Sequence, residues 1–213
     1  MDLRFDPCKE YQDTDYTTIL EAVCLDLNVR LVANTHVNSF LSGSTGVLVL
    51  VHDGRAICAN VGDSRAGLVR MSGSEGESLE MLSRDHTPAE ADERERILQA
   101  GGKIMSCLDP FGNPIGPPRI WDQSGEGPGL MMSRSFGDQM GHLCGMTAMP
   151  EVKFSGKFDG TSVLVVGSDG LWEKMSDQLV THATKRLIKE KDAAEKICKE
   201  LVSIATLRWN KVG

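Results

Sequence analysis

Short unbroken runs of apolar residues alternate in this chain with longer segments in which apolar residues recur every three or four positions. A run that is apolar throughout and too short for a helix is typical of a strand buried on both faces of its sheet. Such runs predict strands at residues 47–51, 55–61, 66–71, 79–82, 130–133 and 161–166. Asp53-Gly54 separates the first two runs and is typical of a hairpin turn.

The longer segments have the periodicity of amphipathic helices. Residues 15–38, 176–188 and 191–208 each place apolar side chains on one side of a predicted helix. The predicted buried face of the first helix consists of Ile19, Val23, Leu27 and Leu31. A fourth helix is predicted to begin at Thr87, whose side chain can act as its N-cap, and to end at Gly101. Strands with flanking helices predict a mixed α/β fold.

One segment, residues 108–129, differs from the rest in composition. It contains ten glycines and prolines and has little apolar periodicity. We therefore predict an exposed, mobile loop. Apolar runs resume directly after this segment, so we interpret it as an insertion within a single domain that spans residues 1–213.

Two of the apolar runs end in an aspartate. Asp63 follows the run at 56–61, and Asp169 follows the run at 163–167 and precedes a glycine. A carboxylate at a strand end can point into a cleft, and hard divalent cations prefer such oxygen ligands. An aspartate in this position can equally cap its own backbone in a turn. Both interpretations stay open for either aspartate taken alone.

Six short motifs place the two aspartates in a wider pattern. In chain order they are Ser42–Gly46, Ala59–Ala66, Leu82–Pro88, Gly129–Asp138, Pro150–Val152 and Gly167–Trp172. Together, and in this order, they resemble the metal-dependent protein phosphatase 2C family, the PPM-type serine/threonine phosphatases. The resemblance implies an α/β sandwich with two antiparallel β-sheets packed face to face and flanking helices, in four αββα layers. It also places residues 108–129 where the family has a flap beside its active site.

The resemblance implies an activity and the residues that serve it. Members of the family hydrolyse phosphoserine and phosphothreonine in phosphoprotein substrates, using a water activated by two or more Mg²⁺ or Mn²⁺ ions. By this resemblance Asp169 is a ligand of a central metal, and Asp63 is a ligand of an additional, more labile metal. Glu173 stands where the family usually has aspartate, and its longer side chain suits the strict geometry of Mg²⁺ less well. No side chain of this sequence is assigned as a nucleophile.

Other parts of the family pattern are missing from the sequence. They are the upstream acidic ligand, the phosphate-binding arginine and the Asp-Gly-His-Gly motif, since none of the three Asp-Gly pairs here is followed by His-Gly. The sequence thus resembles a phosphatase 2C domain truncated at both ends. We expect weak or absent metal binding and little activity from this chain alone. The alternative function is that of a non-catalytic, phosphatase-like binding or regulatory protein.

His86 is the one histidine that suggests acid catalysis. It lies just before the helix predicted to start at Thr87, where a histidine can act as a general acid or form a backbone hydrogen bond within a loop. The acid histidine of the family belongs to the missing Asp-Gly-His-Gly motif. The sequence therefore favours loop packing or a backbone hydrogen bond for His86 over acid catalysis.

Composition narrows the classes of partner and compartment. The net charge of −7 disfavours nucleic acid and anionic membranes as partners, because their phosphates would be repelled. Residues 1–6 lack the features of a signal peptide, and no run reaches the roughly 18 apolar residues of a membrane span. The six cysteines include no Cys-x-x-Cys pair, which disfavours a zinc site. We expect reduced thiols, with Cys24, Cys58 and Cys198 in the core, in a cytoplasmic or nuclear protein.

Overall fold

A computed structural model describes residues 11–71, 79–158 and 160–211. The chain divides into two compact units and passes between them several times. The first unit is formed by the residues up to Gly46, by Ala59–Asp63 and by Asp85–Val152. The second is formed by Val47–Cys58, Ser64–Arg84 and the residues from Lys153 onward. The units are therefore not successive along the chain, and the expected single domain stays a prediction.

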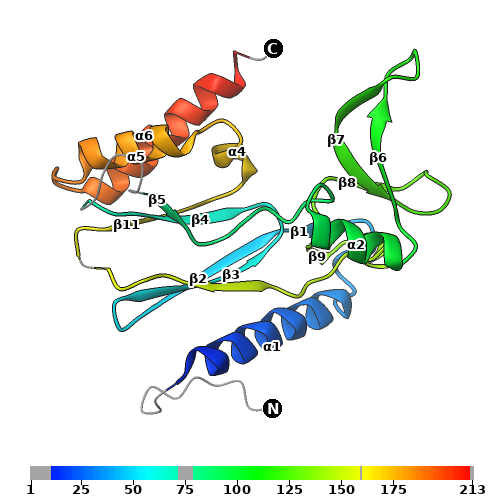
Figure 1. The fold of residues 1–213 in the computed structure, drawn as a ribbon, viewed down its shortest axis with the longest axis horizontal. Coiled ribbons are helices and arrows are strands. Elements are labelled where there is room, and N and C mark those ends of the chain that lie inside the picture. Colours follow the sequence, from blue (N-terminus) through cyan, green and yellow to red (C-terminus); the bar gives the residue numbers. More distant parts are fainter. Residues whose placement is uncertain (1–10, 72–78, 159, 212–213) are drawn as a thin grey trace. The chain divides into compact units, whose positions relative to one another are not determined.

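Two three-stranded sheets contribute to the second unit (Figure 1). The first sheet has the order β11 (Val163–Gly167), β4 (Arg65–Val69) and β5 (Leu79–Met81), and both pairings are antiparallel. The second has the order β10 (Glu151–Phe154), β3 (Arg55–Val61) and β2 (Gly46–His52). The predicted strands at 47–51, 55–61, 66–71, 79–82 and 161–166 are confirmed to within two residues at each end.

Alternation along β4 explains how the layers of the second unit pack. Ala66 and Leu68 face the second sheet, where they join Ala56 and Cys58 of β3 in one apolar core. Val69 points to the opposite face and belongs to the core beneath the helices. Because successive side chains of a strand point to opposite faces, a strand buried on both sides must be apolar throughout. This is the pattern that predicted the strand.

Helices cover the free face of the β11-β4-β5 sheet (Figure 1). They are α4 (Asp169–Trp172), α5 (Asp177–Leu187) and α6 (Ala193–Trp209). Ser176 is the N-cap of α5, and its hydroxyl accepts a hydrogen bond from the Leu179 N–H. The inward side chains of α6 recur every four residues and are Ile197, Leu201 and Ala205. No helix in the three described ranges is long and apolar enough to cross a membrane.

The first unit begins with α1 (Asp13–Val32), which differs from its prediction in two ways. It buries Tyr16, Leu20 and Cys24 instead of the predicted row, in which Leu27 is exposed. Both rows have a spacing of four residues, so periodicity alone cannot choose between them. The helix also ends at Val32 and does not reach the predicted residue 38. After its end, the Asn34 side chain accepts a hydrogen bond from the His36 N–H and stabilises a turn.

The first unit also contains two short strands and two further helices. They are β1 (Gly43–Ser44), β9 (Phe136–Gly137), α2 (Ala91–Gln99) and α3 (Gln139–His142). The helix α2 begins at Ala91, so its predicted start at Thr87 is wrong by several residues. Thr87 instead begins a turn, in which its carbonyl accepts a hydrogen bond from the Glu90 N–H. The predicted end is confirmed, since Gly101 follows the helix with a φ of 88°.

A three-stranded antiparallel sheet within residues 103–130 includes half of the segment 108–129, so the predicted loop is wrong for that half. Its strands are β6 (Lys103–Leu108), β7 (Pro114–Trp121) and β8 (Pro128–Leu130). A register shift between Met105 and Cys107 lies opposite the part of β7 that contains Pro117 and Pro118. A bulge at this place tolerates residues that have no N–H for the ladder. The prolines are thus compatible with a bulged hairpin, although in the sequence they indicated a loop.

Candidate functional site

Asp63 lies in a tight turn at the end of β3. The preceding residue, Gly62, is buried and has a φ of 108°, a conformation that glycine adopts readily. A Cβ atom on Gly62 would come within 2.3 Å of the Thr45 side chain, so no other residue fits. The chain then continues through the half-buried Asp63. The predicted strand-end position of Asp63 is confirmed, whereas its metal-binding role stays a prediction.

A buried histidine holds this turn by its backbone. The Nδ1 atom of His86 accepts a hydrogen bond from the Gly62 N–H at 3.1 Å. The Gly62 carbonyl accepts bonds from the His86 N–H at 3.1 Å and from the Asn60 Nδ2 at 2.9 Å. His86 is 0% exposed. The backbone hydrogen bond favoured by the sequence is therefore confirmed.

Asp169 is the first residue of α4, directly after β11 and the N-cap Ser168. It is exposed, and its Oδ1 accepts a hydrogen bond from the Gly170 N–H at 2.7 Å. Asp169 therefore binds its own backbone, as the turn interpretation expected. This bond does not prevent the carboxylate from also binding a metal ion, because a carboxylate has about four acceptor positions. Asp169 thus presents a carboxylate at a strand end, as the sequence predicted.

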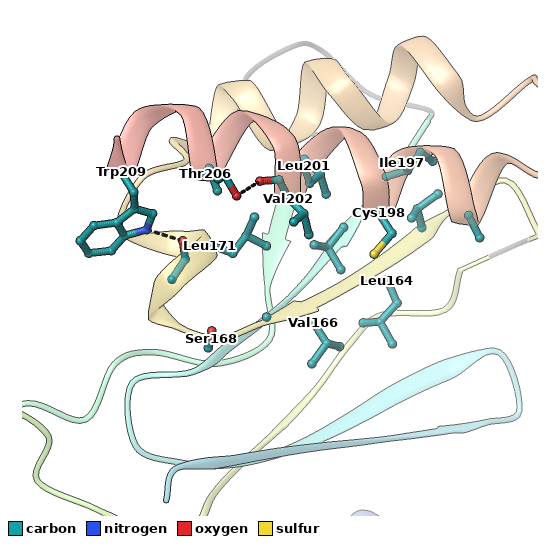
Figure 2. A pocket seen from close by; sticks show the side chains of 16 residues that line it. Leu164, Val166, Ser168, Leu171, Ile197, Cys198, Leu201, Val202, Thr206 and Trp209 are labelled. Atoms are coloured by element: carbon teal, nitrogen blue, oxygen red, sulfur yellow. Dashed lines mark hydrogen bonds between the residues drawn. The ribbon is translucent and has the colours of Figure 1, made fainter. Parts of the chain in front are cut away.

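Two indoles hold α4 in place. The buried Trp172 donates its Nε1–H to the Arg65 carbonyl at 3.1 Å, which ties α4 to the start of β4. Trp209, at the end of α6, donates to the Gly170 carbonyl at 2.8 Å (Figure 2). The backbone that carries Asp169 is therefore fixed from the sheet and from the helix layer.

Glu173 follows Asp169 by one helical turn, so both carboxylates lie on the same side of α4. Its Oε1 is 2.8 Å from the Lys174 ammonium, and that ammonium in turn lies 3.8 Å from the centre of the Trp209 ring. A metal ion would compete with Lys174 for this carboxylate. Glu173 is thus the least suited of the three predicted ligands.

The donor chemistry fits a hard cation, but neither unit alone completes a metal site. Carboxylate oxygens such as those of Asp63 and Asp169 are the ligands that Mg²⁺ and Mn²⁺ prefer. Within each unit, no group of three or more Asp, Glu, His or Cys side chains among the described residues is placed to hold a metal. Each aspartate can therefore contribute carboxylate oxygens to a cation.

A buried carboxylate that sequence reasoning missed organises the first unit. Glu93, on α2, is 0% exposed. Its Oε2 accepts hydrogen bonds from the Ser133 hydroxyl and, at 2.7 Å, from Arg96. Its Oε1 accepts two from Arg134, at 2.9 and 2.5 Å. Burial alone would raise the pKa of Glu93, but the bonds from Arg96, Arg134 and Ser133 outweigh it and hold this pKa well below its usual value of 4.5.

Comparison with known proteins identifies the family. The "Protein phosphatase 2C" family profile matches residues 5–210. The chain belongs to the protein phosphatase 2C family. It is 32% identical over 198 residues to "Probable protein phosphatase 2C 48" of Oryza sativa subsp. japonica, which covers 89% of this chain and 53% of the relative. It is 30% identical over 196 residues to "Probable protein phosphatase 2C 61" of Arabidopsis thaliana, covering 92% and 58%.

Solved phosphatase 2C structures share the fold. A serine-threonine phosphatase 2C from Toxoplasma gondii matches with a TM-score of 0.73 at 20% identity, covering 94% of this chain and 68% of that one. A sex determining protein of C. elegans matches with a TM-score of 0.65 at 19% identity, covering 93% and 45%. The predicted mixed α/β fold with antiparallel sheets is thus confirmed. The chain spans about half the length of the curated relatives it matches.

A pocket of this phosphatase 2C chain reaches both neighbours of Asp169, because Ser168 and Gly170 are among the residues that line it. It has a volume of about 510 Å³ between α6 and β11, and Figure 2 shows Cys198 and Val202 reaching from α6 toward the strand. None of the residues that line it has a charged side chain, so it offers nothing to bind a phosphate. Cys198 lies at this surface and is exposed, so its predicted core position is wrong, whereas Cys24 and Cys58 are buried.

Proposed function

We propose that this chain forms part of a metal-dependent phosphatase that hydrolyses phosphoserine and phosphothreonine in proteins. The observation that carries the proposal is the placement of Asp63 and Asp169, each two residues after the end of an apolar strand and each within a motif of the family. The four-layer αββα arrangement and the use of Mg²⁺ or Mn²⁺ belong to the same proposal. A cytoplasmic or nuclear location is part of it as well.

The proposed roles follow from what each side chain contributes. When bound, the metal ions supply a water activated for attack on phosphorus. Asp63 and Asp169 each contribute carboxylate oxygens to a divalent cation. Trp172 and Trp209 orient Asp169 through their bonds to the backbone around α4. Glu173 would have to share its carboxylate with the Lys174 ammonium, which already contacts its Oε1.

One observation favours the second candidate, a non-catalytic binding or regulatory protein. Within each unit the described residues hold no group of three metal-binding side chains, and Glu173 is already paired with Lys174. A fold that presents carboxylates at the ends of its strands can still recognise a partner through its surface. The two candidates differ in whether the carboxylates support turnover once the rest of a metal site is supplied.

A chimaeric enzyme distinguishes the two candidates. This chain replaces the matching segment of the rice relative, so that the flanking segments come from that protein. We expect Mn²⁺-dependent hydrolysis of a phosphothreonine peptide by the chimaera, and little or no turnover by this chain alone. Changing Asp169→Asn in the chimaera should lower turnover at least as much as the loss of a residue that merely orients a ligand, about 10–100-fold.

The rice protein itself is the positive control, and thermal unfolding of the chimaera shows that it is folded. A folded chimaera without turnover, beside an active rice protein, would favour the non-catalytic candidate. Turnover that survives Asp169→Asn unchanged would contradict the role proposed for that aspartate.

A further inference from the structure

We propose that His86 is a positioning residue that fixes the Gly62–Asp63 turn and thereby the direction of the Asp63 carboxylate. The inference rests on the proposed function only for what Asp63 binds. All of the groups that carry it lie in the first unit. His86 acts through the backbone, because its imidazole contacts Gly62 and not a reacting atom.

His86 contacts both backbone groups of Gly62. Its Nδ1 accepts the Gly62 N–H at 3.1 Å, and its own N–H donates to the Gly62 carbonyl at 3.1 Å. One residue therefore fixes the orientation of the peptide groups on both sides of the Gly62 Cα. Asp63 is the next residue, so any rotation of the peptide that joins it to Gly62 would redirect its side chain.

Gly62 depends on such a contact. Because glycine has no Cβ, its backbone can adopt many conformations besides the observed φ of 108°. A carboxylate that ligates a metal must be held in one orientation, since residues that orient metal ligands change affinity or activity by about 10–100-fold. His86 supplies that restriction where the backbone itself cannot.

His86 is itself fixed to the rest of the unit. Its carbonyl accepts the Ser133 N–H at 2.8 Å, and the Ser133 hydroxyl donates to the buried Glu93. An Nδ1 that accepts a hydrogen bond has no proton, so in the neutral imidazole the proton is on Nε2. That nitrogen faces Glu151, whose Oε2 is 3.5 Å away. Nδ1 is hydrogen-bonded to Gly62, whereas Nε2 only faces Glu151 at 3.5 Å, which allows separate tests.

Two amide substitutions separate the two nitrogens. In His86→Asn the side-chain amide occupies the place of Nδ1 and can still accept the Gly62 N–H. In His86→Gln the amide reaches the place of Nε2 and leaves the Gly62 N–H without this acceptor. Glu151→Gln is the matched control, because it changes the partner of Nε2 and leaves the Gly62 contact intact. Hydrogen exchange of the Gly62 amide is followed by NMR in all variants.

We expect the Gly62 amide to exchange about two- to tenfold faster in His86→Gln than in the wild type, which is the effect of one lost hydrogen bond. In His86→Asn and Glu151→Gln the exchange rate of this amide should equal that of the wild type. Equal exchange in His86→Gln and wild type would overturn the inference. If His86→Gln does not fold, His86→Asn still decides. Its wild-type protection would support the inference, and faster exchange at Gly62 in the folded variant would overturn it.

Titration with Mn²⁺ alone connects the turn to the metal. The Mn²⁺ concentration that halves the Asp63 amide signal should rise in His86→Gln and stay unchanged in His86→Asn. In an Asp63→Asn background, His86→Gln should have no further effect. If Mn²⁺ broadens the amide signals of Asp63→Asn as it does those of the wild type, Asp63 does not bind the metal. The exchange rate of the Gly62 amide then decides by itself whether His86 is a positioning residue.

Discussion

Replacing Glu93 by glutamine is expected to lower the free energy of unfolding by about 3–5 kcal/mol, the usual effect of removing one partner from a buried ion pair. Glu93 is fully buried and accepts hydrogen bonds from Ser133, Arg96 and Arg134. The glutamine amide would place a donor against these donors. It would also leave the guanidinium of Arg134, which is only 11% exposed, without its countercharge. Urea unfolding followed by circular dichroism measures the change.

Glu95→Gln is the matched control for this prediction. Glu95 lies on the same helix but is exposed, and its side chain accepts a hydrogen bond from the amide of Gln99 one turn away. Its substitution should change the free energy of unfolding by less than about 0.5 kcal/mol, as is usual for surface positions. Similar losses in the two variants would show that helix propensity, and not the buried network, is responsible.

The same network predicts how the stability depends on pH. The pKa of Glu93 is lower in the folded state than its ordinary value of 4.5. Its ionised form therefore stabilises the fold fully above the unfolded-state pKa, and this contribution is lost as the pH falls toward the folded-state pKa. The difference in stability between wild type and Glu93→Gln should shrink progressively below about pH 4.5. A difference that is constant between pH 7 and pH 3 would contradict the assignment.

Replacing Trp172 by alanine is expected to cost about 3–5 kcal/mol, the range for truncating a buried aromatic side chain. Trp172 is 3% exposed and belongs to the core between the β11-β4-β5 sheet and the helices. Its loss leaves a large cavity and also removes the hydrogen bond to the Arg65 carbonyl. Thermal and urea unfolding measure the effect, and amide exchange at Gly170 reports whether α4 loosens.

Trp209→Ala separates packing from the hydrogen bond to α4. Trp209 also donates its indole N–H to α4, but its side chain is 43% exposed. Its truncation should therefore cost clearly less stability than that of Trp172, since less apolar surface is lost from the interior. Equal costs would mean that the hydrogen bonds to α4 dominate, and that the core position of Trp172 matters little.

The strands of the second unit could be predicted because local sequence decides them. Most are apolar runs bounded by turn residues, and the pattern is clearest in β3 and β4, whose residues are almost all buried. For the same reason Asp63 and Asp169 could be placed at strand ends. What they bind could not be derived from their positions, because a strand-end aspartate also suits a turn, as the bond from the Gly170 N–H to Asp169 illustrates.

Features that depend on distant partners escaped the prediction. The buried face of α1 is chosen by what packs against it, and two rows with the same spacing gave no basis for a choice. The hairpin of β6 and β7 contains prolines that normally mark a loop. Glu93 lies four residues before the buried Ile97 and thus on the inner face of α2, which is the one local signal of its burial. Its partners Ser133 and Arg134 are far away in sequence.

The central claim is that Asp63 and Asp169 each supply a carboxylate to a divalent cation. The most direct test is a calorimetric and paramagnetic-broadening titration of this chain with Mn²⁺, in the wild type and in Asp63→Asn, Asp169→Asn and Asp177→Asn. The last is the control, because Asp177 is an exposed helix-start aspartate without a proposed role. The account predicts weak binding to the wild type and to Asp177→Asn, weakened at least about tenfold in each of the other two variants. Wild-type Mn²⁺ binding in both Asp63→Asn and Asp169→Asn would contradict it.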